Sequence, residues 1–176
     1  NDIEEIHRKA TVFSPYEKQP EVLEIITVGH LEVVKGNERL LRVAKRLKEE
    51  GFAFCITILG EGTQRSKLEA YIREHALQDC VKMPGFVDNP YPYVKNADLY
   101  VCPSWSEGFS TAVSEAVILG IPVISTRVSG AEEILGANNE YGLVCDNSEE
   151  GIYDAMKTML ENANLRKHYA KKAKER

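Results

Sequence analysis

The sequence lacks the features that mark several large classes of protein. Only four cysteines occur among its 176 residues, and neither a C-x-x-C pair nor a histidine pair accompanies them, which argues against a metal site. No apolar run approaches the roughly 18 residues that a membrane-spanning helix needs, and we find no signal peptide. The formal net charge of −5 lacks the basic excess of nucleic-acid-binding domains. We therefore expect core thiols in a reducing cytoplasm, no metal and no nucleic-acid partner.

The composition that remains is that of an ordinary globular domain. Apolar residues make up 43% of the chain and charged residues 28%. A domain of this size can bury roughly 70% of the surface that its unfolded chain exposes, which is enough for a full core. The chain starts at Asn1 in a helix-like stretch and stops in a charged helix-like tail. We therefore expect it to be one domain of a longer protein.

Apolar, strand-like runs alternate with segments of helical spacing along the whole chain. The expected strands are 22–28, 52–60, 81–85, 99–103, 122–126 and 142–146. The expected helices are 37–50, 64–76, a short one within 89–97, 110–120, 130–135, one that Asn147 or Ser148 caps, and 163–175. About six strands in alternation with helices predict an α/β fold, a Rossmann-like parallel sheet with helices on both faces. Because ligands of such sheets lie beyond the carboxyl ends of the strands, the loops that follow the strands are the candidate site.

Local signals define two of these helices more closely. Asn37 is the expected N-cap of the helix 37–50, and Gly51 is expected to take the left-handed conformation that ends it. In the helix 64–76, Leu68, Ile72 and Ala76 are in phase and are predicted to share one face.

The loop PSWSEGFS (103–110) and the helix after it form the strongest candidate site. A helix that begins near Ser110 leaves its first amides unpaired, which favours an anion, and Gly108 lets a phosphate approach the backbone. Glu107 stands at the mouth of this site. Glu115 lies roughly 7–8 Å along the helix axis from Ser110, in an apolar run where an unbound carboxylate costs several kcal/mol. The two carboxylates suit an elongated ligand with hydroxyls at both ends and phosphates between; alternatively, Glu115 faces solvent.

Two other strand-end loops give weaker signals. In GHLEVVKG (29–36) the flexible ammonium of Lys35 could reach phosphate oxygens, although a solvated lysine before a helix fits the same pattern. In GEGTQ (60–64) the glycines are common to many strand-to-helix turns. Trp105 is expected to be wall or core rather than a stacking platform.

The segments resemble one family in their order along the chain. EGFSTAVSE matches the E-x7-E motif of retaining glycosyltransferases, above all glycosyltransferase family 4, which have the GT-B fold. VGHLEVVKG, ILGEG, VKMPGF, SEAVILGIPVIST and SGAEEI resemble further family segments, and NDIEEI resembles the hinge between the two domains. The resemblance implies that residues 1–176 are the C-terminal, donor-binding half of such an enzyme, and that the N-terminal acceptor domain lies outside this chain.

The resemblance also implies roles for the matching residues. Glu107 would hold hydroxyls of the donor sugar, Glu115 would hold the ribose hydroxyls, and Lys35 would neutralise the diphosphate and stabilise the leaving nucleotide. The remaining donor contacts, many of them from the backbone, would lie at Gly29, His30, Gly62, Phe86, Val87, Gly108, Phe109, Ser110 and Thr111, with the base beside Phe86 and Val87. His30 stands where the family usually has arginine, and histidine is only partly charged near pH 7. We therefore expect more of the leaving-group stabilisation to come from Lys35.

The implied reaction transfers a sugar from a nucleotide-diphosphate sugar to an acceptor hydroxyl, with retention at the anomeric carbon and without a cofactor or a metal. The acceptor, a saccharide or a lipid, would be held by the missing N-terminal domain, so this chain alone should transfer little. The expected setting is polysaccharide or glycolipid synthesis in the cytoplasm or, with the full-length enzyme peripheral to the membrane, at its inner face. Because backbone groups recognise the base, the sequence does not distinguish UDP from GDP donors.

Three alternatives stay open on the sequence alone. A nucleotide-sugar epimerase of the same fold would convert the donor without any acceptor. A dinucleotide-binding oxidoreductase domain would need G-x-G-x-x-G after the first strand, and GHLEVVKG lacks it. A non-catalytic scaffold descended from a transferase would have no need to keep both carboxylates and Lys35.

Overall fold

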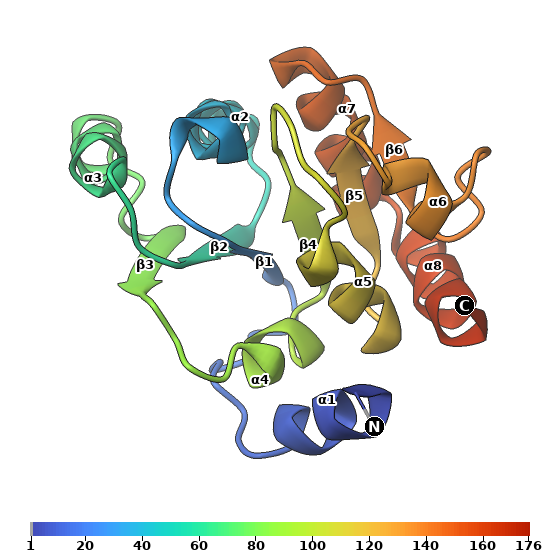
Figure 1. Cartoon of the computed structure of the whole chain (residues 1–176). Helices are drawn as coiled ribbons and strands as arrows, with labels where there is room; N and C mark the ends of the chain where they lie inside the picture. The colour runs from blue at the N-terminus through green and yellow to red at the C-terminus, as the bar shows by residue number, and fades with distance from the viewer. Residues whose placement is uncertain (1) are drawn as a thin grey trace.

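The computed structural model describes residues 2–176, and within them six strands form one parallel sheet in the order β3-β2-β1-β4-β5-β6 (Figure 1). The strands are β1 (Leu23–Val28), β2 (Phe54–Leu59), β3 (Val81–Gly85), β4 (Leu99–Cys102), β5 (Val123–Thr126) and β6 (Leu143–Cys145). Each strand lies within the range that its apolar run predicts. The Rossmann-like α/β class is therefore confirmed.

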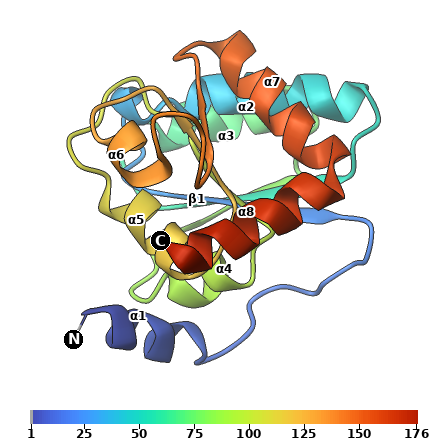
Figure 2. The ribbon, with the colours of Figure 1, turned by 90° about the vertical axis from the view of Figure 1, so that its right-hand side faces the viewer.

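Helices cover both faces of this sheet (Figure 2). They are α1 (Asp2–Ala10), the 3-10 turn η1 (Val33–Lys35), α2 (Asn37–Glu49), α3 (Arg65–Glu74), α4 (Tyr91–Lys95), α5 (Thr111–Ile118), α6 (Ala131–Leu135), α7 (Glu149–Glu161) and α8 (Ala163–Glu175). α2, α3 and α7 pack on the face that carries Ile25, and α1, α4, α5 and α6 pack on the face that carries Ile26. Every residue of β2 is buried, as expected for a continuous apolar strand between two helical layers.

The strand order reverses between β1 and β4, and this reversal positions the site. From β1 the chain proceeds through β2 to β3 at one edge, and from β4 it proceeds through β5 to β6 at the other. Such a switch point is the usual ligand site of open α/β sheets. The loops that follow β1 and β4, 29–36 and 103–110, therefore meet there.

Two boundary predictions are wrong, each for a reason in the backbone. Gly36 rather than Asn37 is the N-cap of α2, because η1 ends on Gly36 with a φ of 73°. An ideal Cβ at Gly36 would lie 2.0 Å from the carbonyl oxygen of Pro103, so only glycine fits between the two loops. Ala76 lies beyond the end of α3 with a φ of 53° and is exposed, and the next residue, Leu77, is buried instead.

Other helix ends are as predicted. Gly51 follows α2 with a φ of 92°. Ser110 caps α5, and Ser148 rather than Asn147 caps α7. The hinge-like segment NDIEEI forms the beginning of α1 from Asp2 onward; its first residue lies outside the described range.

Candidate functional site

A cavity of about 410 Å³ opens at the switch point, between the ends of β1 and β4 and the start of α5. Eight of the twelve residues predicted for the site line it: Gly29, His30, Lys35, Glu107, Phe109, Ser110, Thr111 and Glu115. They come from two segments that are far apart in the sequence, namely the loop after β1 and the loop after β4 with the helix α5 that follows it. The fold therefore brings the two carboxylates and the lysine to a common space.

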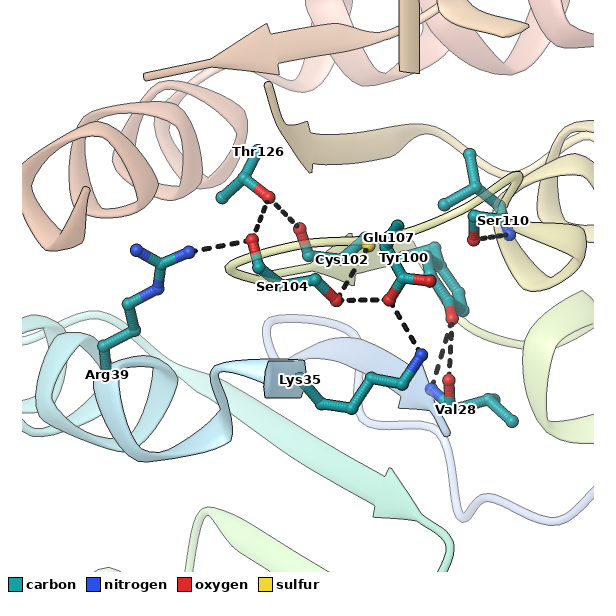
Figure 3. A network of polar contacts seen from close by, with 10 residues as sticks. Val28, Lys35, Arg39, Tyr100, Cys102, Ser104, Glu107, Ser110 and Thr126 are labelled. Carbon is teal, nitrogen blue, oxygen red and sulfur yellow. Dashed lines mark hydrogen bonds and ion pairs between the residues drawn. The ribbon is translucent and has the colours of Figure 1, made fainter. Parts of the chain in front are cut away.

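Lys35 and Glu107 form an ion pair in this cavity, with 2.8 Å between Nζ and Oε2 (Figure 3). The hydroxyl of Ser104 donates a hydrogen bond of 2.5 Å to the same carboxylate oxygen. The side chains of Lys35 and Glu107 are 28% and 11% exposed, so both charges are largely withdrawn from water but open to the cavity. The two groups expected to meet a phosphate and a sugar thus lie in direct contact.

Ser104 is a site residue that the sequence analysis missed. It is 2% exposed and lies two residues after the end of β4, where its hydroxyl also contacts the thiol of Cys102 at 3.6 Å. Its position in a strand-end loop was the available signal. Only its contact to Glu107, which the sequence does not contain, distinguishes this serine from the other serines of the loop.

Arg39 and Thr126 hold the backbone of the loop after β4. The Arg39 side chain is 1% exposed, and its Nε and Nη2 donate to the carbonyl of Pro103 at 3.1 and 2.8 Å. The carbonyl of Ser104 accepts from Arg39 Nη2 at 2.9 Å and from the Thr126 hydroxyl at 2.7 Å. Trp105, predicted as wall or core, covers the Arg39 guanidinium at 3.7 Å and is itself 52% exposed. These contacts fix the loop before any ligand arrives.

The amino end of α5 borders the same cavity. The Ser110 hydroxyl accepts a hydrogen bond of 3.2 Å from the amide of Val113, as its predicted capping role requires. No acidic side chain occupies the first turn of α5, so the positive end of the helix remains available to an anion. Phe109 is 61% exposed beside it, and a Cβ added at Gly108 would meet no described atom within 4 Å. The loop can therefore admit a ligand close to its backbone.

Glu115 is half-buried and lines the cavity, so the alternative in which it faces bulk water is contradicted. Its Oε2 accepts a hydrogen bond of 2.6 Å from the hydroxyl of Tyr91 on α4. Burial, and then this bond to Glu115, raise the pKa of Tyr91 to about 12. The phenol is therefore protonated and a donor at neutral pH. The sequence analysis placed a short helix here but did not identify Tyr91.

A second cavity of about 480 Å³ adjoins the first and shares Val28, Gly29 and His30 with it. Phe86 and Val87, the residues predicted to lie beside a base, line this second cavity, and Phe86 is 73% exposed. The two cavities together give an elongated space, with His30 where they meet.

Gly62 and Gly108 are the two predicted residues that line neither cavity in the structure of residues 2–176. An ideal Cβ at Gly62 would lie 2.5 Å from the carbonyl oxygen of Leu31 and 2.7 Å from a carboxylate oxygen of Glu32. The close approach of two backbone segments explains this glycine, and its donor contact stays a prediction.

The cysteines are free thiols, as expected for core residues. Cys55, Cys80 and Cys102 are buried and Cys145 is half-buried. Burial raises the pKa of Cys80 and of Cys145 to about 11, so both are neutral near pH 7. Across the described residues, no three side chains of histidine, cysteine, aspartate or glutamate gather as a metal site would require. No helix in residues 2–176 is both long and apolar enough to span a bilayer.

Comparison of the chain with known proteins identifies its family. The model of the glycosyl transferases group 1 matches residues 8–176. A relative from Campylobacter jejuni, N-acetylgalactosamine-N,N'-diacetylbacillosaminyl-diphospho-undecaprenol 4-alpha-N-acetylgalactosaminyltransferase, is 37% identical over 154 residues, which cover 86% of this chain and 41% of the relative. This chain therefore spans less than half the length of that relative.

Solved structures show the same fold. A complex of Staphylococcus aureus TarM with fondaparinux, alpha-GlcNAc-glycerol and UDP superimposes with a TM-score of 0.80 at 22% identity, over 93% of this chain and 33% of that one. WaaG, a glycosyltransferase involved in lipopolysaccharide biosynthesis, superimposes with a TM-score of 0.78 at 22% identity, over 99% and 46% of the two chains. The sheet and its helices have the same fold as the matched part of these GT-B glycosyltransferase structures. With nearly its whole length matched by the family model, the chain belongs to the glycosyl transferases group 1.

Proposed function

We propose that this chain is the donor-binding domain of a retaining glycosyltransferase of family 4, which transfers a sugar from a nucleotide-diphosphate sugar to an acceptor hydroxyl. The observation that carries the proposal is that Lys35, Glu107 and Glu115 surround one cavity at the amino end of α5. The adjoining cavity beside Phe86 would take the base. The ribose would then lie at Glu115, with the diphosphate and sugar between Lys35 and Glu107.

A donor of this kind offers better partners to both members of the ion pair. Phosphate oxygens can replace Glu107 as the partner of the Lys35 ammonium, while sugar hydroxyls can donate to the Glu107 carboxylate. Because an unpaired charge in a partly buried site is costly, we expect the two exchanges to occur together. The ion pair would thus keep both groups in position until a complete donor binds.

Cleavage of the bond between sugar and phosphate leaves negative charge on the departing diphosphate. The Lys35 ammonium and the unpaired amides of α5 are fixed beside the cavity, and preorganised groups of this kind supply a large share of catalysis in such sites. His30 borders both cavities and would add a hydrogen bond to the departing diphosphate. This chemistry requires no cofactor and no metal ion.

The acceptor is inferred from relatives. The Campylobacter jejuni relative is named for transfer to an undecaprenol diphosphate saccharide, and WaaG for a role in lipopolysaccharide synthesis. We infer a saccharide or lipid-linked saccharide as the acceptor, bound by a domain outside residues 1–176, at the cytoplasmic face of the membrane. This chain alone is expected to bind donor weakly and to transfer little.

The two enzymatic alternatives receive less support. The family match and the transferase names of the relatives do not favour an epimerase. The loop after β1 lacks the glycines of a dinucleotide-binding site. An epimerase would isomerise the donor in the absence of any acceptor, so incubation of the full-length enzyme with donor alone separates the two reactions.

Calorimetry with UDP, GDP and ADP, each with and without a hexose, tests the proposal. We expect one of the nucleotides to bind. Lys35→Ala should weaken the binding of the nucleoside diphosphate, and Glu107→Gln should weaken chiefly the binding of the nucleotide sugar. Lys171→Ala, an exposed lysine on α8, is the matched control and should bind as the unmodified chain does. Absence of nucleotide binding, or tighter binding of NAD, would contradict the proposal.

A further inference from the structure

Asn37, the first residue of α2, is a buried polar residue without a hydrogen-bond partner for its carbonyl oxygen. It is 6% exposed. Among the described residues, only its Oδ1 and Nη1 of Arg39 are fully buried side-chain nitrogen or oxygen atoms that lack a partner. Buried polar groups are nearly always paired, and an exception calls for an explanation such as a bound ligand or water. The Arg39 guanidinium makes several other hydrogen bonds, whereas no side-chain bond of Asn37 is found within residues 2–176.

Asn147, which contacts Arg39, is an asparagine with a structural role in the same region. Its Oδ1 accepts from Arg39 Nη2, and its Nδ2 donates to the carbonyl of Trp105 at 2.8 Å. Its Oδ1 thus joins the segment before α7 to Arg39 on α2, and its Nδ2 joins that segment to the loop after β4. Asn37 makes no such bonds within the described residues, and it lines both the cavity proposed for the donor and a smaller cavity of about 240 Å³ beside Trp105.

The neighbours of Asn37 indicate which part of a donor it would meet. It lines the cavity together with Lys35, Ser104 and Glu107, and the preceding glycine contacts the loop that carries Ser104. This is the part of the cavity that the proposed function gives to the transferred sugar. We propose, on the basis of that proposed function, that the Asn37 side-chain amide forms a hydrogen bond with a hydroxyl of the transferred sugar and thereby helps to select the sugar.

The chemistry of an amide fits a hydroxyl better than a phosphate. An asparagine side chain offers a donor and an acceptor, as a hydroxyl does, whereas phosphate oxygens only accept and already have Lys35 and the amides of α5. A site built to bond a hydroxyl discriminates strongly, because a sugar without that hydroxyl leaves buried polar groups unpaired. The position of Asn37 is also fixed, since the backbone before it is locked against Pro103.

Calorimetry on this chain separates a sugar contact from a phosphate contact. The nucleotide probes are UDP, GDP and ADP, and the nucleotide-sugar probes are UDP-glucose, UDP-N-acetylglucosamine, GDP-mannose and ADP-glucose. The nucleotide and the nucleotide sugar that bind the unmodified chain most tightly are then used to compare the variants. We expect Asn37→Ala to bind the nucleoside diphosphate within about twofold of the unmodified chain, and the nucleotide sugar about fivefold to tenfold more weakly, as the loss of one hydrogen bond predicts. If Asn37→Ala binds both ligands equally more weakly, or binds both as tightly as the unmodified chain does, the inference is overturned.

Thermal unfolding of two asparagine variants supplies a second readout. Because Asn37 leaves a polar group unpaired, we expect Asn37→Ala to unfold at or above the Tm of the unmodified chain. Asn147→Ala loses two hydrogen bonds and should unfold about 2–6 °C lower. An equal fall in both variants would assign Asn37 a structural role and overturn the inference. If the unmodified chain binds no nucleotide, the proposed function fails as well; if it binds and Asn37→Ala binds both ligands equally well, only the Asn37 inference fails.

Discussion

Glu107 and Glu115 are held by different partners, although the sequence motif presents them as two equivalent acids. Glu107 is paired with the cation of Lys35, whereas Glu115 accepts from the neutral phenol of Tyr91. A carboxylate with a single neutral donor keeps most of its lone pairs for ligand hydroxyls. Under the proposed function, Glu115 would accept from a diol as it stands, whereas Glu107 would first exchange its partner.

Removal of the Glu115 carboxylate should weaken nucleotide binding. We expect Glu115→Ala to lose about 1.5–3 kcal/mol of nucleotide binding free energy, because hydrogen bonds to a charged group disappear. Calorimetry with the free nucleotide measures the loss. Glu133→Ala, an exposed glutamate on α6, is the control; equal affinities of the two variants would show that Glu115 does not contact the ligand.

Tyr91 is expected to act through Glu115. Tyr91→Phe keeps the ring but removes the hydroxyl that donates at 2.6 Å, so the carboxylate loses the group that orients it. We expect a loss of about 1 kcal/mol in nucleotide binding, and no further loss when the same change is made in Glu115→Ala. A double-mutant cycle by calorimetry checks this. Additive losses would mean that Tyr91 affects binding by another route.

At the scale of elements, the connection from η1 to α2 positions the candidate site. Gly36 is both the C-cap of η1 and the N-cap of α2, and its backbone lies against Pro103. This single residue therefore helps to set the distance between the segments that carry Lys35 and Glu107. The 3-10 turn presents Lys35 toward the loop after β4 (Figure 3). A change in this connection should therefore affect stability and binding at once.

Two glycine-to-alanine variants separate backbone strain from this close contact. Gly51 and Gly36 both have positive φ, 92° and 73°, but within the described structure a Cβ at Gly51 meets nothing within 4 Å. We expect Gly51→Ala to cost about 1–2 kcal/mol of unfolding free energy from its conformation alone, and Gly36→Ala to cost more and to weaken nucleotide binding. Chemical denaturation and calorimetry measure both effects. Similar stability of the two variants, with binding intact, would contradict the role given to Gly36.

At the scale of the whole molecule, buried thiols predict a loss of stability at alkaline pH. The pKa values of Cys80 and Cys145 are raised by burial from 9.0 to about 11, so the folded state keeps protons that the unfolded chain releases. The stabilisation is complete below pH 9 and falls as the pH rises toward 11. Unfolding temperatures measured from pH 8 to pH 10.5 should decline, and less steeply for a variant with alanine at both positions. Parallel curves for the two proteins would contradict the assignment.

The sequence predicted the strands more accurately than the helix ends. The six apolar runs mark the strands because strands buried on both faces exclude polar residues along their length. The N-cap of α2 was assigned to Asn37 instead of Gly36, because the cap depends on the contact between Gly36 and Pro103, which no local pattern contains. Ser104, Tyr91 and Asn37 were missed for the same reason: each is an ordinary loop or helix residue until its neighbours in space are known.

By itself the sequence determined the α/β class and pointed to the loops of the candidate site, and eight of the twelve residues that it predicted for this site line the cavity. Only the tertiary structure decided the partners: Lys35 with Glu107, 72 residues apart, and Tyr91 with Glu115, 24 residues apart. The physical reason is that the periodicity of the sequence shows which face of an element is buried, whereas contacts between loops depend on the order of the strands in the sheet. The reversal between β1 and β4 brings those loops together, and it is a property of the sheet as a whole.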